Sequence, residues 1–298
     1  MSLIPFVDRK PELALFHRML AGETDKRILR ILVQAEWGKT RFLLQLLQEC
    51  EQQSPPVPVV LLNFDQRCSG LTDFLSVVRA VRRQLGDDFT PAICAYEDDI
   101  YRRAPLVNIH TGEGGAGVDW GRRGRFTEAD ISDVTGRDRI QVGPVSEAAP
   151  TADLIAWQKA QMGRALCRDL SGLVASHHRV VLLVDTFDHI SEDTRIWLER
   201  WLFEPLCREL RRVLLVVAGR PEECQPFFEQ LRPWSSLVAP IDRFTPFNSD
   251  DVQDYCYQRG LLVSEEEMPL ILDLTRASSP AEMARIGDLL IQERGGAP

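Results

Sequence analysis

Four largely apolar runs constrain the fold of this chain more than any other feature. They occupy residues 28–33 and 57–65 and, later in the chain, the segments RVVLLVDTFDHI and RVLLVVAGRPE. Segments with a helical period separate them, as expected when both faces of a parallel sheet are covered by helices. The pattern predicts a three-layer α/β fold with a parallel sheet between helix layers, and SSLVAPIDRF can supply a fifth strand.

The pattern becomes helical after residue 246. Asn248 stands at a predicted helix N-cap, Asp251 three residues later completes a capping box, and two further helical segments follow. We therefore predict an α/β core over residues 1–246 and a small helical lid over residues 247–298. Within the core, residues 96–150 are rich in glycine and charge and lack a lasting period, so they are predicted to form a partly flexible insertion.

The composition limits the classes of partner and the compartment. A formal net charge of -9 gives no overall positive field for phosphate backbones or anionic lipid, so nucleic acid is an unlikely partner. Seven widely spaced cysteines without a C-x-x-C pair indicate buried thiols in a reducing compartment. No signal-peptide pattern and no apolar run long enough for a membrane span occur, which predicts a cytoplasmic protein.

A possible phosphate-binding loop follows the first apolar run. Gly38, Lys39 and Thr40 match the end of the G-x-x-x-x-G-K-[ST] pattern and lie between a predicted strand and a predicted helix. In such loops the backbone amides and the lysine hold phosphates, and the hydroxyl binds Mg²⁺. The sequence therefore predicts a nucleotide site formed by these three residues and Arg41, with Thr40 as a metal ligand.

Two positions of this loop depart from the pattern. Val33 stands where the first glycine is expected, and Glu36 stands where a second glycine is common. A glutamate points a carboxylate toward the phosphate region, and valine does not readily adopt positive φ. Both changes count against tight binding of a triphosphate.

Three charged residues are expected at the same edge of the sheet as Lys39. Asp185 ends a buried strand and could hold Mg²⁺, and Asp188 could polarise an attacking water. Arg220 follows the next strand and could sense a γ-phosphate. Thr186 stands where a second acid is often found, which predicts slow hydrolysis at most.

The order of these motifs resembles the STAND branch of AAA+ like P-loop NTPases, which includes the NACHT and NB-ARC switches. The segments that carry the resemblance are FVDRKPEL, WGKT, LLVDTFD, VVAGR, FTPFNSDDVQDYCYQRGL and ASSP. The resemblance implies that Phe6, Val7 and Arg9 lie by the adenine, and that Pro280 of the lid approaches the base. Asp8 replaces the family's glycine in the first of these segments, and serines replace both small lid positions.

The resemblance implies a nucleotide-binding switch in bacterial signalling or defence against phage, binding ATP or ADP with Mg²⁺ and hydrolysing it weakly or not at all. In the family, ADP holds the lid closed and exchange for ATP opens it for oligomerisation. Residues 1–10 leave no room for an effector and the chain stops at Pro298, so a separate effector or sensor protein is the expected partner, with a homo- or hetero-oligomer possible.

A pseudo-NTPase that bridges partner proteins without nucleotide is the main alternative, because the degenerate loop suits an inactive member. A third reading is a DNA-handling AAA+ ATPase. The basic segment GRRGR at residues 121–125 is its best support, but the negative net charge of the chain counts against it. A hydrolase built on Cys and His lacks a nucleophile motif near His177 and His178.

Overall fold

The computed structural model describes the residues of six segments, 9–65, 70–103, 152–230, 232–245, 247–276 and 280–293. The predictions from the sequence that lie outside them are Phe6 and Val7 by the adenine and, over residues 104–150, the insertion with its GRRGR segment.

The core of the molecule is a five-stranded parallel sheet. Its strands, in chain order, are β1 (Ile28–Leu32), β2 (Val59–Asn63), β3 (Val180–Asp185), β4 (Val213–Gly219) and β5 (Val238–Ile241). They pair in the spatial order β2-β3-β4-β1-β5, and every pair is parallel. β3 and β4 are buried along their whole length, which is why their sequences are apolar on both faces. The predicted three-layer α/β fold with a parallel sheet, including the fifth strand, is confirmed.

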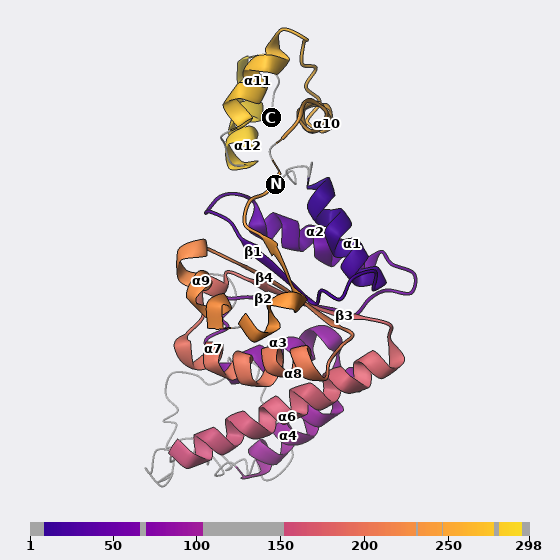
Figure 1. The fold of residues 1–298 in the computed structure, drawn as a ribbon, viewed down its shortest axis with the longest axis vertical. Helices are drawn as coiled ribbons and strands as arrows, with labels where there is room; N and C mark the ends of the chain where they lie inside the picture. Colours follow the sequence, from indigo (N-terminus) through magenta and orange to yellow (C-terminus); the bar gives the residue numbers. More distant parts are fainter. Residues whose placement is uncertain are drawn as a thin grey trace, which may run out of the picture.

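Helices cover both faces of this sheet (Figure 1). On one face, α1 (Lys10–Ala21) and α2 (Lys39–Glu51) pack against the strands through a buried cluster that includes Phe16 and Phe42. The other face is covered by five helices: α3 (Phe74–Leu85), α6 (Ala152–Ser176), α7 (Glu192–Leu198), α8 (Glu204–Arg208) and α9 (Pro221–Gln230).

One helix extends further than the sequence pattern indicates. α4 (Pro91–Arg103) packs on α6, so residues 96–103 are helical although the irregular insertion was expected to begin near 96. Asp169 of α6 explains how this helix starts, because its carboxylate accepts hydrogen bonds at 2.9 Å from the amides of Ala92 and Ile93. The contacts with α6 stabilise a helix whose extent the sequence pattern did not indicate.

Three helices form a separate cluster at one end of the molecule: α10 (Ser249–Gln258), α11 (Glu267–Arg276) and α12 (Pro280–Glu293) (Figure 1). The capping box predicted for α10 is present, with Asn248 accepting from the amides of Asp250 and Asp251. A small apolar core that includes Val252, Tyr255 and Met283 holds the three helices together. The proposed boundary at residue 246 falls outside the described residues and stays a prediction.

Two general expectations concern the cysteines and membranes. All six cysteines that the structure describes are free thiols, and four of them are buried. Within the described residues, no helix has the length and apolar character required to cross a membrane.

Candidate functional site

The predicted charged residues meet at the carboxyl edge of the sheet. Lys39 begins α2 directly after the loop that follows β1, Asp185 is the last residue of β3, and Arg220 follows β4. Since the sheet is parallel, these three strands end at the same edge. The pKa of Lys39 responds to the charges of Asp185, Asp188 and Arg220, so all four groups lie within electrostatic reach of one another.

The loop before α2 takes a left-handed conformation at two residues, Glu36 (φ 66°) and Gly38 (φ 80°). Glycine suits the second position, whereas a side chain at the first is strained. Val33 is not in the left-handed region and is only 2% exposed. The objection that valine would need positive φ was therefore wrong, because Val33 serves as a core residue at the end of β1.

The Lys39 side chain turns back over its own loop. Its ammonium group donates hydrogen bonds to the carbonyl oxygens of Val33 at 2.7 Å and Gln34 at 2.8 Å. An ammonium has three N–H donors, so one remains for a further acceptor. Burial lowers the pKa of Lys39, and the carboxylates of Asp188 and Asp185 act in the opposite direction. The lysine is thus fixed where it can bind an anion over the loop.

Thr40 and Asp185 are direct neighbours, because the threonine side chain hydrogen-bonds to the aspartate carboxylate. The amide of Thr186 donates to the same carboxylate at 2.9 Å. Asp185 is 2% exposed, and this burial raises its pKa, while the hydrogen bonds from Thr40 and Thr186 and the charge of Lys39 oppose the rise. A hydroxyl and a carboxylate side by side are oxygen donors suited to Mg²⁺, which takes one or two protein ligands beside phosphates and waters.

Asp188 contacts the end of β4. Its carboxylate accepts a hydrogen bond from the amide of Arg220 at 3.2 Å and lies 3.2 Å from the Nε of the same residue. The His189 ring nitrogen lies 3.6 Å from the same carboxylate. The two residues predicted as catalytic are therefore paired with each other.

Asn63 and Thr186 complete this edge of the sheet, and sequence reasoning did not identify Asn63. It ends β2 beside Asp185, and its side-chain oxygen accepts from the Thr186 hydroxyl at 3.5 Å. Thr186 itself is left-handed with φ 55°, which is unusual for a β-branched residue. The polar Asn63 at the end of an apolar run was the signal that could have revealed it.

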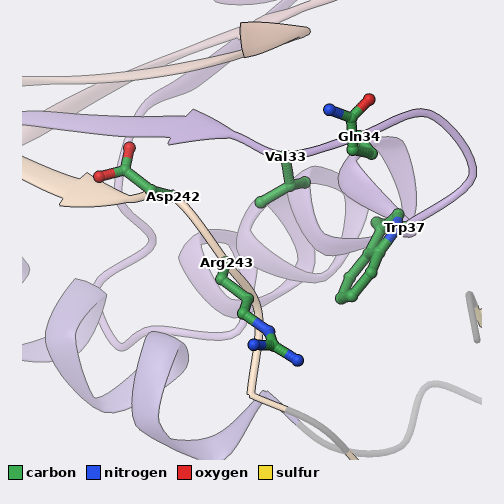
Figure 2. Close-up of a pocket in the computed structure, with 5 residues that line it drawn as sticks. All are labelled: Val33, Gln34, Trp37, Asp242 and Arg243. Atoms are coloured by element: carbon green, nitrogen blue, oxygen red, sulfur yellow. The ribbon is translucent and has the colours of Figure 1, made fainter. Parts of the chain in front are cut away.

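A pocket of about 400 Å³ lies on the other side of β1, at the end of β5. Val33, Trp37 and Arg243 point into the same space in Figure 2, whereas the polar ends of Gln34 and Asp242 point away from it. Both of those polar groups have partners elsewhere: Gln34 donates to Glu222 at 3.0 Å, and Asp242 pairs with Arg30 at 2.6 Å. The pocket thus offers an apolar and aromatic wall with one guanidinium.

Arg9 lies at the junction with the three-helix cluster. It is 5% exposed and donates to the carbonyl oxygen of Thr245. Its guanidinium lies 4.4 Å from the ring centre of Phe244 and 5.2 Å from that of Phe247. Glu12 contacts the same linker. Its carboxylate accepts hydrogen bonds from the amide of Thr245 at 2.8 Å and from the hydroxyl of Thr245 at 3.0 Å. These side-chain contacts join Arg9 and Glu12 to the linker between β5 and α10.

Two other predicted residues are placed only in part. Arg41 is a half-buried residue of the first turn of α2. Pro280 is the first residue of α12.

Comparisons with known proteins identify distant structural neighbours. No protein-family model and no curated protein matches the sequence. The structure is similar to that of the ORC2 protein of Aeropyrum pernix in ADPNP-ADP complexes, with 14% identity and a TM-score of 0.47, covering 92% of this chain and 58% of that one. It is also similar to Cdc6p of Pyrobaculum aerophilum, with 16% identity and a TM-score of 0.46, covering 97% of this chain and 61% of that one. The chain thus spans about three-fifths of the length of these proteins.

Proposed function

We propose that this chain is a nucleotide-controlled switch of the STAND type that binds ATP or ADP with Mg²⁺ and hydrolyses it slowly or not at all. The observation that carries the proposal is the position of Lys39. Its ammonium is held over the loop by two carbonyl oxygens and keeps one donor for a phosphate. The amides at the start of a helix add further donors, since they have no partner within the helix.

The neighbouring oxygen ligands support Mg²⁺ at this loop. Thr40 and Asp185 contact each other beside Lys39, at the edge where β3 ends. When bound, the metal would neutralise phosphate charge there. Thr40 and Asp185 would hold it, and Lys39 would hold the phosphate oxygens.

The pocket at β5 suits the base of the same nucleotide. β1 is flanked by β4 on one side and by β5 on the other, so a phosphate chain directed toward Asp185 and Arg220 leaves the nucleoside toward β5. There Trp37 and Val33 provide apolar surface, and Arg243 can donate hydrogen bonds or stack.

The helices α10–α12 are proposed to act as the lid of this switch. They have their own apolar core, and the linker that joins them to β5 contains Arg243 of the pocket and the residues held by Arg9 and Glu12. A nucleoside in the pocket would contact this linker directly. Binding could thereby change how the three helices sit on the core. Control of a separate effector or sensor protein, and oligomerisation, rest on the resemblance of the motif order to the STAND branch.

Isothermal titration calorimetry with ATP and ADP, with and without Mg²⁺, tests the proposal. Lys39→Ala should lower the affinity for either nucleotide at least about tenfold, because it removes a charge-assisted hydrogen bond to phosphate. Lys159→Ala is the matched control, since Lys159 pairs with Asp193 on the surface at 3.2 Å and should bind as the wild type does. Absence of binding at millimolar nucleotide, or equal binding by Lys39→Ala, would refute it.

A nucleotide-independent scaffold is the second candidate, and Glu36 favours it. This residue places an exposed carboxylate in the loop, at a strained position where glycine is preferred. A scaffold would bind its partner protein equally well with and without nucleotide and with Lys39→Ala, as a pull-down of native complexes can show.

A further inference from the structure

The carboxylate of Asp188 is almost fully buried against the main chain at the end of β4. Its side chain is 4% exposed, and it belongs to the short helical turn Phe187–His189 that follows β3. The close approach depends on Gly219, because a Cβ there would come within 3.2 Å of an Asp188 oxygen and 2.3 Å of the Cys224 sulfur. The fold therefore leaves room for this carboxylate beside Arg220.

Both oxygens of this carboxylate are engaged. Oδ1 accepts from the amide of Arg220 at 3.2 Å, and Oδ2 faces the Arg220 Nε at 3.2 Å. The His189 ring nitrogen lies 3.6 Å from Oδ2. A general base needs a free oxygen within hydrogen-bond reach of the water that it activates. The Asp188 side chain is only 4% exposed, so the lone pairs left on its two engaged oxygens have little access to water in this arrangement.

The same contacts fix the orientation of the Arg220 guanidinium. Asp188 binds both the main-chain amide and the Nε of Arg220, so it restrains the arginine at its backbone and at the inner nitrogen of the guanidinium. The terminal nitrogens carry four more N–H donors, and only Nη1 has a further described ion-pair contact, 3.7 Å from Glu223. Arg220 is half-exposed, and its charge reaches Lys39.

We propose that Asp188 is a positioning residue that holds Arg220 ready for the terminal phosphate of ATP, and that it does not activate water. The inference rests on the proposed nucleotide site at Lys39. Asp188 then governs how well the protein distinguishes ATP from ADP, because only ATP offers the γ-phosphate that Arg220 would contact. Slow hydrolysis is expected as well, because the Asp188 carboxylate that pairs with Arg220 does not activate a water.

The test compares the affinities of a non-hydrolysable ATP analogue and of ADP, both with Mg²⁺, for four variants. D188N should weaken the ATP analogue about tenfold, the loss expected for one misplaced charge-assisted hydrogen bond, and change ADP less than about twofold. R220K should do the same, because lysine keeps the charge but cannot bond through Nε. The double variant D188N/R220A should be no worse than R220A alone.

Two outcomes would overturn the inference. One is a D188N protein that keeps the wild-type ratio of ATP to ADP affinity but loses all hydrolysis, since that identifies a water-activating base. The other is a D188N/R220A protein whose loss of affinity for the ATP analogue equals the sum of the losses of the two single variants. If D188N does not fold, R220K still tests the pair, because it changes the arginine instead of the aspartate.

A further measurement distinguishes failure of the proposed nucleotide site from failure of the Asp188 inference. If the wild type binds neither nucleotide, the Nε–H signal of Arg220 in ¹⁵N NMR still reports the pair. Protection of that proton from exchange in the wild type and its loss in D188N supports the positioning role. Equal exchange in both proteins refutes it.

Discussion

At the residue scale, the site contains two side chains in a backbone conformation that they tolerate poorly. Glu36 has φ 66° in the phosphate loop, and Thr186 has φ 55° directly after Asp185. Left-handed residues other than glycine cost roughly 1–3 kcal/mol and persist where the surrounding structure imposes them. Both residues lie beside groups that are proposed to bind phosphate or metal. Replacing them therefore tests two quantities, the free energy of unfolding and the affinity for nucleotide.

Thr186→Asn should raise the free energy of unfolding by about 1 kcal/mol, because asparagine adopts the left-handed region more readily than a β-branched residue. Urea unfolding of the two proteins measures this difference. Thr72→Asn serves as control, since Thr72 is exposed and not left-handed, and it should show no gain. A loss of stability in Thr186→Asn would mean that the threonine contact with Asn63 outweighs the strain.

Glu36→Gly should tighten ADP binding about tenfold, because it removes a like charge from the phosphate cradle and supplies the residue that the loop conformation prefers. Glu36→Gln removes the charge but keeps the strained backbone, so its gain should be smaller. Calorimetric titration with ADP and Mg²⁺ ranks the three proteins. Identical affinities in all three would show that the carboxylate does not face the phosphates.

Asp185→Asn should stabilise the protein at neutral pH and abolish the contribution of Mg²⁺ to nucleotide binding. Burial raises the pKa of Asp185, so the folded protein binds its proton more tightly than the unfolded chain. The charged carboxylate therefore costs stability above the raised pKa. That cost disappears as the pH falls through the raised value toward the ordinary 3.8.

Urea unfolding at neutral pH and at acidic pH checks this sign. The advantage of Asp185→Asn should shrink at the lower pH, where the wild-type carboxyl is protonated. Asp254→Asn, at an exposed position of α10, should show no comparable pH-dependent gain. An advantage that grows on acidification would contradict the prediction.

At the scale of elements, the linker between β5 and α10 and the start of α10 are held by Arg9, directly before α1, and by the first turn of α1. Arg9 bonds the Thr245 carbonyl and stacks on Phe244 and Phe247, while Glu12 holds the amide and hydroxyl of Thr245. Lys10 adds a longer contact of 3.9 Å to Asp251 of α10. These contacts join residues more than 230 positions apart.

Arg9→Ala should destabilise the protein by about 2 kcal/mol, because it removes a buried hydrogen bond from a charged group and two cation–π contacts. Thermal and urea unfolding measure the loss. Arg18→Ala is the control: Arg18 is 61% exposed and lies 4.0 Å from Glu23, so its removal should cost less than about 0.5 kcal/mol. Equal effects of the two substitutions would show that the buried contacts do not hold the linker.

Most elements could be predicted from local sequence, whereas the contacts between them could not. Strands such as β3 and β4 are apolar throughout because both faces are buried, and the capping box of α10 lies within four residues. The Asp188–Arg220 pair and the position of Asn63 depend on which strands are neighbours, which a single sequence does not state. The extent of α4 to Arg103 was missed because this helix packs on α6, which lies far along the chain.

At the scale of the whole molecule, the strand order separates two halves of one candidate site. β4 and β3 carry Arg220 and Asp185 on one side of the phosphate loop, and β5 leads to the pocket with Trp37 and Arg243 on the other. Lys39 lies between them at the start of α2. A nucleotide would have to span both halves, with its phosphates over the loop and its base toward the linker to α10–α12.

A crystal structure of the protein with ADP and Mg²⁺ measures this arrangement most directly. The account predicts the β-phosphate within hydrogen-bond distance of the Lys39 ammonium, the metal on Thr40 beside Asp185, and the base against Trp37. ADP bound elsewhere on the molecule, or no ADP at a concentration that saturates binding in solution, would contradict it.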